Sequence, residues 1–266
     1  WSRADEMKMP RAIFINKLDR EHSSFDDTLA DIKENLDAKA IPVQMPWGKE
    51  AGLKGIVDLI SLKTYVYKND KSGDFTLQDV PGELRDAVVS ARNRLVEAVA
   101  ESDDHLIEVY LETGELSEEE LKKGLADAIS EAKLFPVMCG SATQMLGIAP
   151  LMDIIADELP SPKCGTPVSG NDEHGAPIER IRSETEPFSA LVFKTLVDPF
   201  VGKLTLCRVY SGTVTPDFHY YNPSRRVRER SAGLFSLNGK KQDPLEGAAA
   251  GDLIALAKLK DTHTGD

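Results

Sequence analysis

The feature of this sequence that most constrains its fold is a change of pattern around residues 163–187. Before it, short apolar runs alternate with segments whose apolar residues recur at helical spacing, as in α/β domains. From Phe188 onward, short runs of β-branched and aromatic residues alternate with turn residues, which is typical of a small β-barrel. We therefore expect an α/β domain over residues 1–162, a linker over 163–186 and an all-β domain over 187–266.

Apolar runs and periodicity predict the elements of the α/β part. Residues 11–15 and 134–139 are short apolar runs before polar loops, so we expect two buried parallel strands. Residues 41–46 carry two prolines and should be extended, and residues 55–78 should form a small antiparallel sheet. Helical periodicity predicts helices at residues 25–36, 82–101, 103–112, 117–132 and 149–159, and Ser117 opens a capping box for the fourth.

Composition places the chain among ordinary globular proteins. Its 266 residues are 41% hydrophobic and 29% charged, with a formal net charge of −12. The acidic excess lies in residues 1–187, which disfavours broad contact with a phosphate backbone there. Residues 188–266 hold slightly more basic than acidic side chains, which leaves contact with RNA open.

Cysteine usage and hydropathy bear on the compartment. Cys139, Cys164 and Cys207 are scattered, so they form neither a disulfide framework nor a metal-binding spacing. No apolar run approaches the roughly 20 residues that cross a bilayer. We therefore expect a protein of the reducing cytoplasm that has no membrane partner.

The tetrapeptide Asn16-Lys17-Leu18-Asp19 directly follows the first predicted strand, where α/β sheets bind ligands. A carboxylate at Asp19 can accept hydrogen bonds from the N1–H and the exocyclic amine of guanine. Adenine would leave that carboxylate unpaired, at a cost of about 1–3 kcal/mol or more. The stem of Lys17 can cover the base, and the Asn16 amide can donate and accept. Taken alone, this short pattern equally fits a polar loop with a surface aspartate.

A second motif, Cys139-Gly140-Ser141-Ala142, follows the other predicted parallel strand. It resembles the fifth motif of GTPases. This resemblance implies that the backbone N–H of Ala142 donates to guanine O6 and that the Ser141 hydroxyl braces Asp19. Asn16, Lys17, Asp19, Ser141 and Ala142 are therefore the predicted nucleotide-binding residues.

The chain resembles elongation factor G, a translational GTPase, over nearly its whole length. The matching stretches occur in family order at residues 14–20, 55–59, 139–142, 159–162, 187–191, 198–202, 208–212, 259–261 and 264–266. The resemblance implies that residues 1–162 are the C-terminal part of a P-loop GTPase G domain, with an inserted α+β subdomain at about 40–132. It also implies that residues 187–266 are the domain II barrel.

The same resemblance implies GTP or GDP as the ligand and the ribosome, both its rRNA and its proteins, as the partner. In this family, domain II faces the small ribosomal subunit. The basic run at residues 225–230 could belong to that face, although a solvated β-hairpin explains it equally well.

The sequence contains no Gly-x-x-x-x-Gly-Lys-[Ser/Thr], the loop that cradles nucleotide phosphates. Asp79-Val80-Pro81-Gly82 formally matches the Asp-x-x-Gly switch motif, but it lies after Asn16-Lys17-Leu18-Asp19 rather than before it, so we expect a turn into a helix. The first residue is Trp1 and no signal peptide follows it. We expect an internal fragment, with Mg²⁺ ligands and switch residues upstream and the barrel cut at its end, that does not hydrolyse GTP.

Two departures from the family pattern leave alternatives open. Elongation factor G carries a Met-His pair in domain II, which residues 233–241 lack, so the chain resembles a divergent branch. Gln144-Met145-Leu146 is less polar than the family pattern, and we expect weaker packing on the base there. Other possibilities are a ribosomal protection protein, a release-factor GTPase, or a non-catalytic module that binds the ribosome or another protein.

Overall fold

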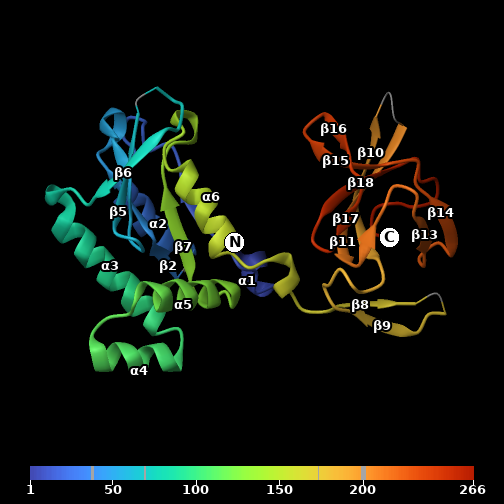
Figure 1. Ribbon diagram of the computed structural model, residues 1–266, viewed down its shortest axis with the longest axis horizontal. Coiled ribbons are helices and arrows are strands. Elements are labelled where there is room, and N and C mark those ends of the chain that lie inside the picture. Colours follow the sequence, from blue (N-terminus) through green and yellow to red (C-terminus); the bar gives the residue numbers. More distant parts are fainter. Residues whose placement is uncertain (37–38, 69, 173, 199–201) are drawn as a thin grey trace. The chain divides into compact units, whose positions relative to one another are not determined.

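The computed structural model describes residues 1–36, 39–68, 70–172, 174–198 and 202–266. They form two compact units, Trp1–Pro160 and Ser161–Asp266 (Figure 1). The two units meet between Pro160 and Ser161. No helix in the described part of the chain is long and apolar enough to span a membrane.

A three-stranded parallel sheet lies at the centre of the first unit. Strand β7 (Phe135–Cys139) is the middle strand, flanked by β1 (Ile13–Ile15) and β2 (Ala40–Pro42). Every residue of β7 is buried, which explains its continuous apolar sequence. In the register of β1 on β7, Ile15 lies opposite Cys139. The loops that follow these two strands therefore start side by side, although more than a hundred residues separate them.

The predicted small antiparallel sheet has four strands, in the order β3-β4-β5-β6. Its strands are β3 (Gln44–Trp47), β4 (Gly55–Asp58), β5 (Lys63–Tyr67) and β6 (Phe75–Asp79). Strand β6 falls almost wholly within the predicted range 55–78; its Phe75 and Leu77 alternate with polar residues, although all five of its residues are exposed. The predicted turn between β5 and β6 includes Asn69, which lies outside the described residues.

The five predicted helices are all present, with end positions shifted by a few residues. They are α2 (Phe25–Leu36), α3 (Arg85–Ala100), α4 (Asp104–Thr113), α5 (Glu118–Ser130) and α6 (Ile148–Asp157). The predicted capping box is formed at Ser117, whose side chain accepts from the Glu120 N–H while the Glu120 side chain accepts from the Ser117 N–H. A further helix, α1 (Ser2–Glu6), is too short to show a period. As predicted, residues 79–82 turn into a helix: β6 ends at Asp79, and a 3₁₀ turn (Gly82–Leu84) leads into α3.

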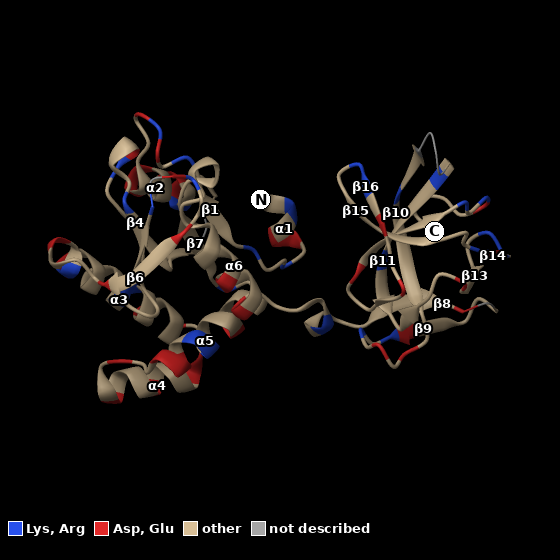
Figure 2. Ribbon diagram, turned by 45° about the horizontal axis from the view of Figure 1, so that its top comes forward, with Lys and Arg blue, Asp and Glu red and all other residues tan. Residues whose placement is uncertain are grey.

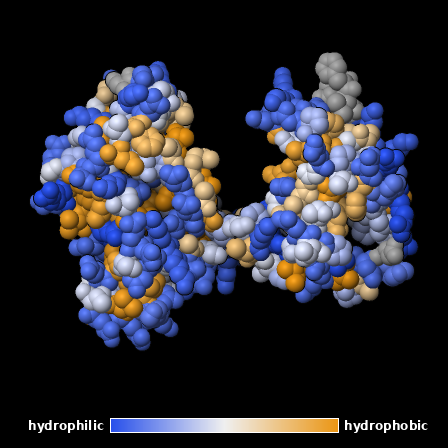
Figure 3. Space-filling view, in the orientation of Figure 1, coloured by the Kyte–Doolittle hydropathy of each residue, from blue (hydrophilic) through white to orange (hydrophobic). Residues whose placement is uncertain are grey.

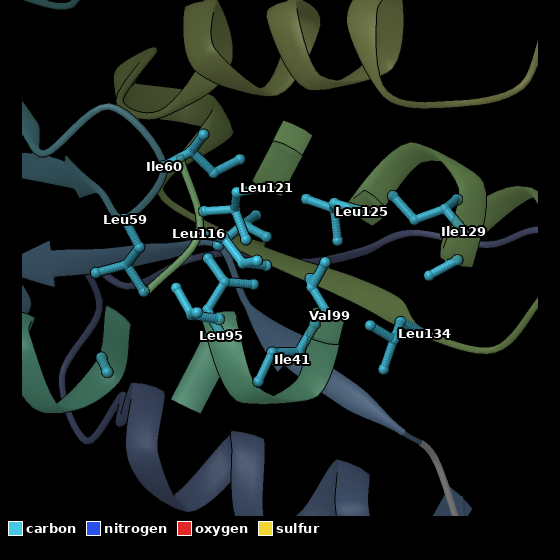
Figure 4. Close-up of a cluster of buried hydrophobic side chains, with 14 of the residues drawn as sticks. Ile41, Leu59, Ile60, Leu95, Val99, Leu116, Leu121, Leu125, Ile129 and Leu134 are labelled. Carbon is cyan, nitrogen blue, oxygen red and sulfur yellow. The ribbon is translucent and has the colours of Figure 1, made fainter. Parts of the chain in front are cut away.

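Two apolar clusters cover the two faces of the parallel sheet. On one face, α3 and α5 pack their stripes together through fully buried side chains such as Leu95, Leu121 and Leu125 (Figure 4). On the other face, Phe25 of α2 packs with Phe135, Val137 and other residues. Successive residues of β7 alternate between the clusters, as expected of a strand covered on both sides.

The second unit is all-β. Its main sheet is antiparallel in the order β10-β11-β18-β15-β16. These strands are β10 (Ser189–Asp198), β11 (Gly202–Ser211), β18 (Leu253–Ala257), β15 (Leu234–Asn238) and β16 (Lys241–Pro244). Two short pairs complete the unit, β12 (Thr213–Val214) with β17 (Ala248–Ala249) and β13 (His219–Asn222) with β14 (Val227–Arg230). Part of the family stretch at residues 198–202 lies outside the described residues.

The segment predicted as a linker contains a β-hairpin. Its strands are β8 (Val168–Asn171) and β9 (Pro177–Arg180). Sequence patterning did not indicate these strands, because their side chains are mostly exposed and include serine, glycine, asparagine and proline. Residues that neither alternate in polarity nor favour strands give no period-two signal.

Surface charge differs between the two units. Asp and Glu are prominent on α4 and α5, whereas Lys and Arg are prominent around β14 (Figure 2). The visible surface of both units is largely hydrophilic, with apolar patches scattered over it (Figure 3). This distribution agrees with the acidic first part and mildly basic second part of the sequence.

Candidate functional site

The two loops that follow β1 and β7 form the candidate site. Backbone hydrogen bonds tie them together, from the Gly140 N–H to the Ile15 carbonyl at 3.0 Å and from the Leu18 N–H to the Gly140 carbonyl at 3.2 Å. Gly140 is required there, because a Cβ would lie 2.2 Å from the Leu146 carbonyl oxygen. The sheet register thus brings the two predicted motifs into one place.

Asn16 joins the loops through its side chain. Its Oδ1 accepts hydrogen bonds from the Lys17 N–H at 2.7 Å and from the Ala142 N–H at 2.9 Å. The sequence-based interpretation directed the Ala142 N–H to guanine O6, whereas here that N–H is engaged by Asn16. A base carbonyl that approaches Ala142 must therefore share this donor or displace the Asn16 oxygen.

Lys17 has an exposed side chain and a left-handed backbone, with φ of 64°. Such a conformation costs energy for a residue with a Cβ and is concentrated at functional loops. The next residue, Leu18, is buried in the apolar cluster below. This alternation fixes the loop while leaving the Lys17 stem free to cover a flat ligand.

Asp19 lies between the loops with its side chain only 14% exposed. Its Oδ2 accepts from Gln144 Nε2 at 3.4 Å and lies 3.9 Å from Arg20 Nε. Its Oδ1 is buried and has no hydrogen-bond partner. The pKa of this carboxyl is lowered, first by the Ser141 hydroxyl and then by backbone and Gln144 hydrogen bonds and the charge of Arg20, against a burial effect that raises it.

Ser141 is fully buried and anchors its loop. Its N–H donates to the Leu146 carbonyl at 2.9 Å, and its carbonyl accepts from the Leu146 N–H at 3.0 Å. The Ser141 hydroxyl influences Asp19 strongly, yet Oδ1 of Asp19 still lacks a direct donor. Ser141 therefore lies close enough to Asp19 to favour its ionised form.

Sequence reasoning missed Gln144 as a partner of Asp19. A 3₁₀ turn (Ala142–Gln144) follows Ser141 and turns the Gln144 side chain back toward the first loop. Met145 then takes a left-handed conformation with φ of 59°. Residue spacing predicts neither this turn nor the contact between Gln144 and Asp19. The sequence showed only that residues 144–146 are less polar than the family pattern.

The site contains no sign of nucleophilic or metal chemistry among the described residues. Burial raises the pKa of the Cys139 and Cys207 thiols, so neither is a reactive thiolate at neutral pH. No group of three His, Cys, Asp or Glu side chains in the described ranges is arranged to hold a metal ion.

Family models match both parts of the chain. The elongation factor Tu GTP binding domain matches residues 1–161, and elongation factor G domain 2 matches residues 187–266. The chain belongs to the elongation factor G family of translational GTPases. A solved crystal structure of a protein from Thermus thermophilus is similar, with 28% sequence identity and a TM-score of 0.81. The match covers 100% of this chain and 36% of that one, so the chain spans about a third of that protein's length.

The residues that the resemblance assigns to guanine lie together on the two loops that follow β1 and β7. The orphaned Oδ1 of Asp19 is a charged acceptor without a donor, and guanine carries two adjacent donors on its N1 and C2 edge. Beside it, the Asn16 amide and the Ala142 N–H are held by each other. The sequence contains no phosphate-binding loop motif, so these residues could contact only the base of a nucleotide.

The basic run in domain 2 forms strand β14 and the turn that joins it to β13. Arg230 pairs with Asp217, and Arg225 Nε lies 3.4 Å from Asp266 Oδ2. Arg226 is at the turn with φ of 57° and an exposed side chain. Two of the run's arginines thus have carboxylate partners within their own unit.

Proposed function

We propose that this chain supplies the guanine-recognition part of a translation elongation factor of the G kind, which couples GTP hydrolysis to a ribosomal step such as translocation. The observation that carries the proposal is the meeting of two loops around Asp19, whose Oδ1 is buried without a donor. A base that offers N1–H and an exocyclic amine to one carboxylate satisfies this oxygen, whereas adenine cannot.

Each predicted residue then has a role in base recognition. Asp19 accepts from the N1–H and the exocyclic amine. Lys17 covers one face of the ring with its methylene stem. Ala142 shares its N–H between Asn16 and guanine O6, and Ser141 keeps Asp19 ionised, consistent with its lowered pKa. The same set rejects adenine at two positions, because adenine lacks the N1 proton and carries an amine where guanine has O6.

We infer that hydrolysis depends on residues outside this sequence. Phosphoryl transfer requires a phosphate cradle, Mg²⁺ ligands and a positioned water. The printed sequence has no phosphate-loop motif, so the chain as it stands recognises a base and does not cleave GTP. The ribosome is the proposed partner of the parent protein, and the basic β13–β14 hairpin is the proposed point of contact with rRNA.

An Asp19→Asn exchange tests base recognition directly. The asparagine carbonyl can still accept a hydrogen bond from the N1–H of the base. Its NH₂ group donates where the second carboxylate oxygen accepted from the guanine amine, so it pairs with the C2 carbonyl of xanthine. We expect Asp19→Asn to reverse the preference from GMP to XMP. NMR titrations of the ¹⁵N-labelled chain at millimolar nucleotide measure this.

The control is Asp31→Asn, which removes an exposed carboxylate from α2 in the same unit. It should leave the preference for GMP unchanged. A preference for GMP over XMP that persists in Asp19→Asn would contradict the assignment of Asp19.

A further inference from the structure

The two oxygens of the Asp19 carboxylate have different surroundings. Oδ2 receives the Gln144 amino group at 3.4 Å and faces Arg20 Nε at 3.9 Å. Oδ1 is buried and receives nothing from the protein. A carboxylate held through one oxygen has less rotational freedom, so the direction of the other oxygen is fixed before a ligand arrives.

The backbone around Gln144 is anchored on both sides. Ala142, at the start of its 3₁₀ turn, donates to Asn16 Oδ1 at 2.9 Å. After the turn, Leu146 exchanges two backbone hydrogen bonds with the buried Ser141. The Gln144 side chain is itself half-buried. Its amide is therefore placed by the second loop and acts on the aspartate of the first.

We propose that Gln144 is a positioning residue for guanine specificity: its amide N–H holds Asp19 Oδ2 and so fixes the orientation of the carboxylate that receives the base. The inference rests on the proposed function and adds a residue to it. Oδ2 keeps an unused lone pair for the exocyclic amine, since each carboxylate oxygen accepts about two hydrogen bonds. The amide itself is not required to touch the base.

Two substitutions separate donation from side-chain shape. Gln144→Glu has nearly the same size but, when ionised, cannot donate and faces Asp19 with a like charge. Gln144→Lys keeps a donor at the end of a long side chain and adds an attractive charge. We expect the glutamate variant to lose about tenfold in affinity for GMP, because an unmatched charged hydrogen bond costs that order. The lysine variant should keep its preference for GMP over AMP.

The test uses the ¹⁵N-labelled chain and titrations with GMP and with AMP, followed at the amides of the two loops. Spectra of each variant without nucleotide confirm that the fold is retained. Gln78→Glu, on the exposed strand β6, introduces the same change of charge elsewhere in the unit and should behave like the unmodified chain.

The outcomes distinguish this inference from the proposed function. If the unmodified chain shows no preference for GMP over AMP, the proposed function fails and the role of Gln144 fails with it. If the unmodified chain prefers GMP and Gln144→Glu preserves that preference, Gln144 is not a positioning residue, although guanine recognition stands. An equal loss of affinity for GMP in the Gln144→Glu and Gln144→Lys variants would also overturn the inference. It would show that a hydrogen-bond donor to Asp19 at position 144 does not determine the affinity.

Discussion

At the scale of single residues, the chain places largely buried carboxylates at more than one position. Asp19 has a buried oxygen without a donor at the loops that meet over β1 and β7. Glu158 follows α6, is only 5% exposed, and its side chain forms no ion pair in the described part of the chain. The difference between them is chemical. The pKa of Asp19 is lowered by polar neighbours, whereas burial and the charges of Asp157 and Asp58 raise the pKa of Glu158 to about 7, with Lys122 opposing.

The raised pKa of Glu158 predicts a pH-dependent stability. The folded state holds the proton more tightly than the unfolded state, so Glu158 costs nothing below pH 4.5, its ordinary pKa. The free energy of unfolding should then fall as the pH rises toward 7 and level off above it. Glu158→Gln removes the ionisation and should stabilise the chain by about 1–3 kcal/mol at pH 8.

Urea unfolding at pH 5 and at pH 8 measures this effect. The stabilisation should be present at pH 8 and largely absent at pH 5. Glu112→Gln, at an exposed position of α4 in the same unit, is the matched control and should change little at either pH. An equal effect of Glu158→Gln at both values would rule out ionisation as its cause.

At the scale of elements, the hairpin of β5 and β6 reaches the candidate site. Gly73, in the turn between these strands, has φ of 80°, and a Cβ there would lie 3.2 Å from the Met145 Cβ. Tyr67, at the end of β5, packs against the cluster that also holds Leu18 and Cys139. The inserted sheet therefore supports the loop that carries Ser141, Ala142 and Gln144.

This contact predicts an effect of Gly73→Ala on both stability and the site. The added methyl meets Met145 and disfavours the left-handed backbone, so we expect a loss of about 1 kcal/mol in the free energy of unfolding. Amide shifts at Ser141–Met145 should change as well. Gly114→Ala is the control, because Gly114 has φ of 79° but nothing within 4 Å of a Cβ. If both variants shift the loop equally, the hairpin does not support it.

The same elements show what sequence could and could not predict. Helices such as α3 and α5 were predictable, because one face of each is buried and the period of 3.6 residues follows directly. The β8–β9 hairpin was not, because its side chains are mostly exposed and include few residues that favour strands. The five proposed site residues were chosen from local motifs. Gln144 was not among them, because its role depends on a turn that only three-dimensional packing sets.

At the scale of the whole molecule, the chain combines two units of different class and charge. The first joins a parallel sheet to an inserted antiparallel sheet, and the second is all-β. Asn16, Lys17 and Asp19 come from one end of the first unit's sequence, and Ser141 and Ala142 come from near its other end. If these residues recognise the base, the whole first unit must fold, because the parallel pairing of β1 with β7 joins the two motifs.

Recognition of a base without recognition of phosphates gives a prediction for the chain as a unit. We expect GMP and GDP to bind with similar affinity, no tighter than about millimolar, because a base alone contributes a small share of a nucleotide's binding free energy. Each added phosphate would gain nothing where no loop cradles it, and the affinity should vary little with salt. Calorimetry and NMR titration at two ionic strengths measure both quantities, with AMP as the control for base specificity. Micromolar binding of GDP, or a gain above about tenfold from GMP to GDP, would show that this chain contains a phosphate site of its own.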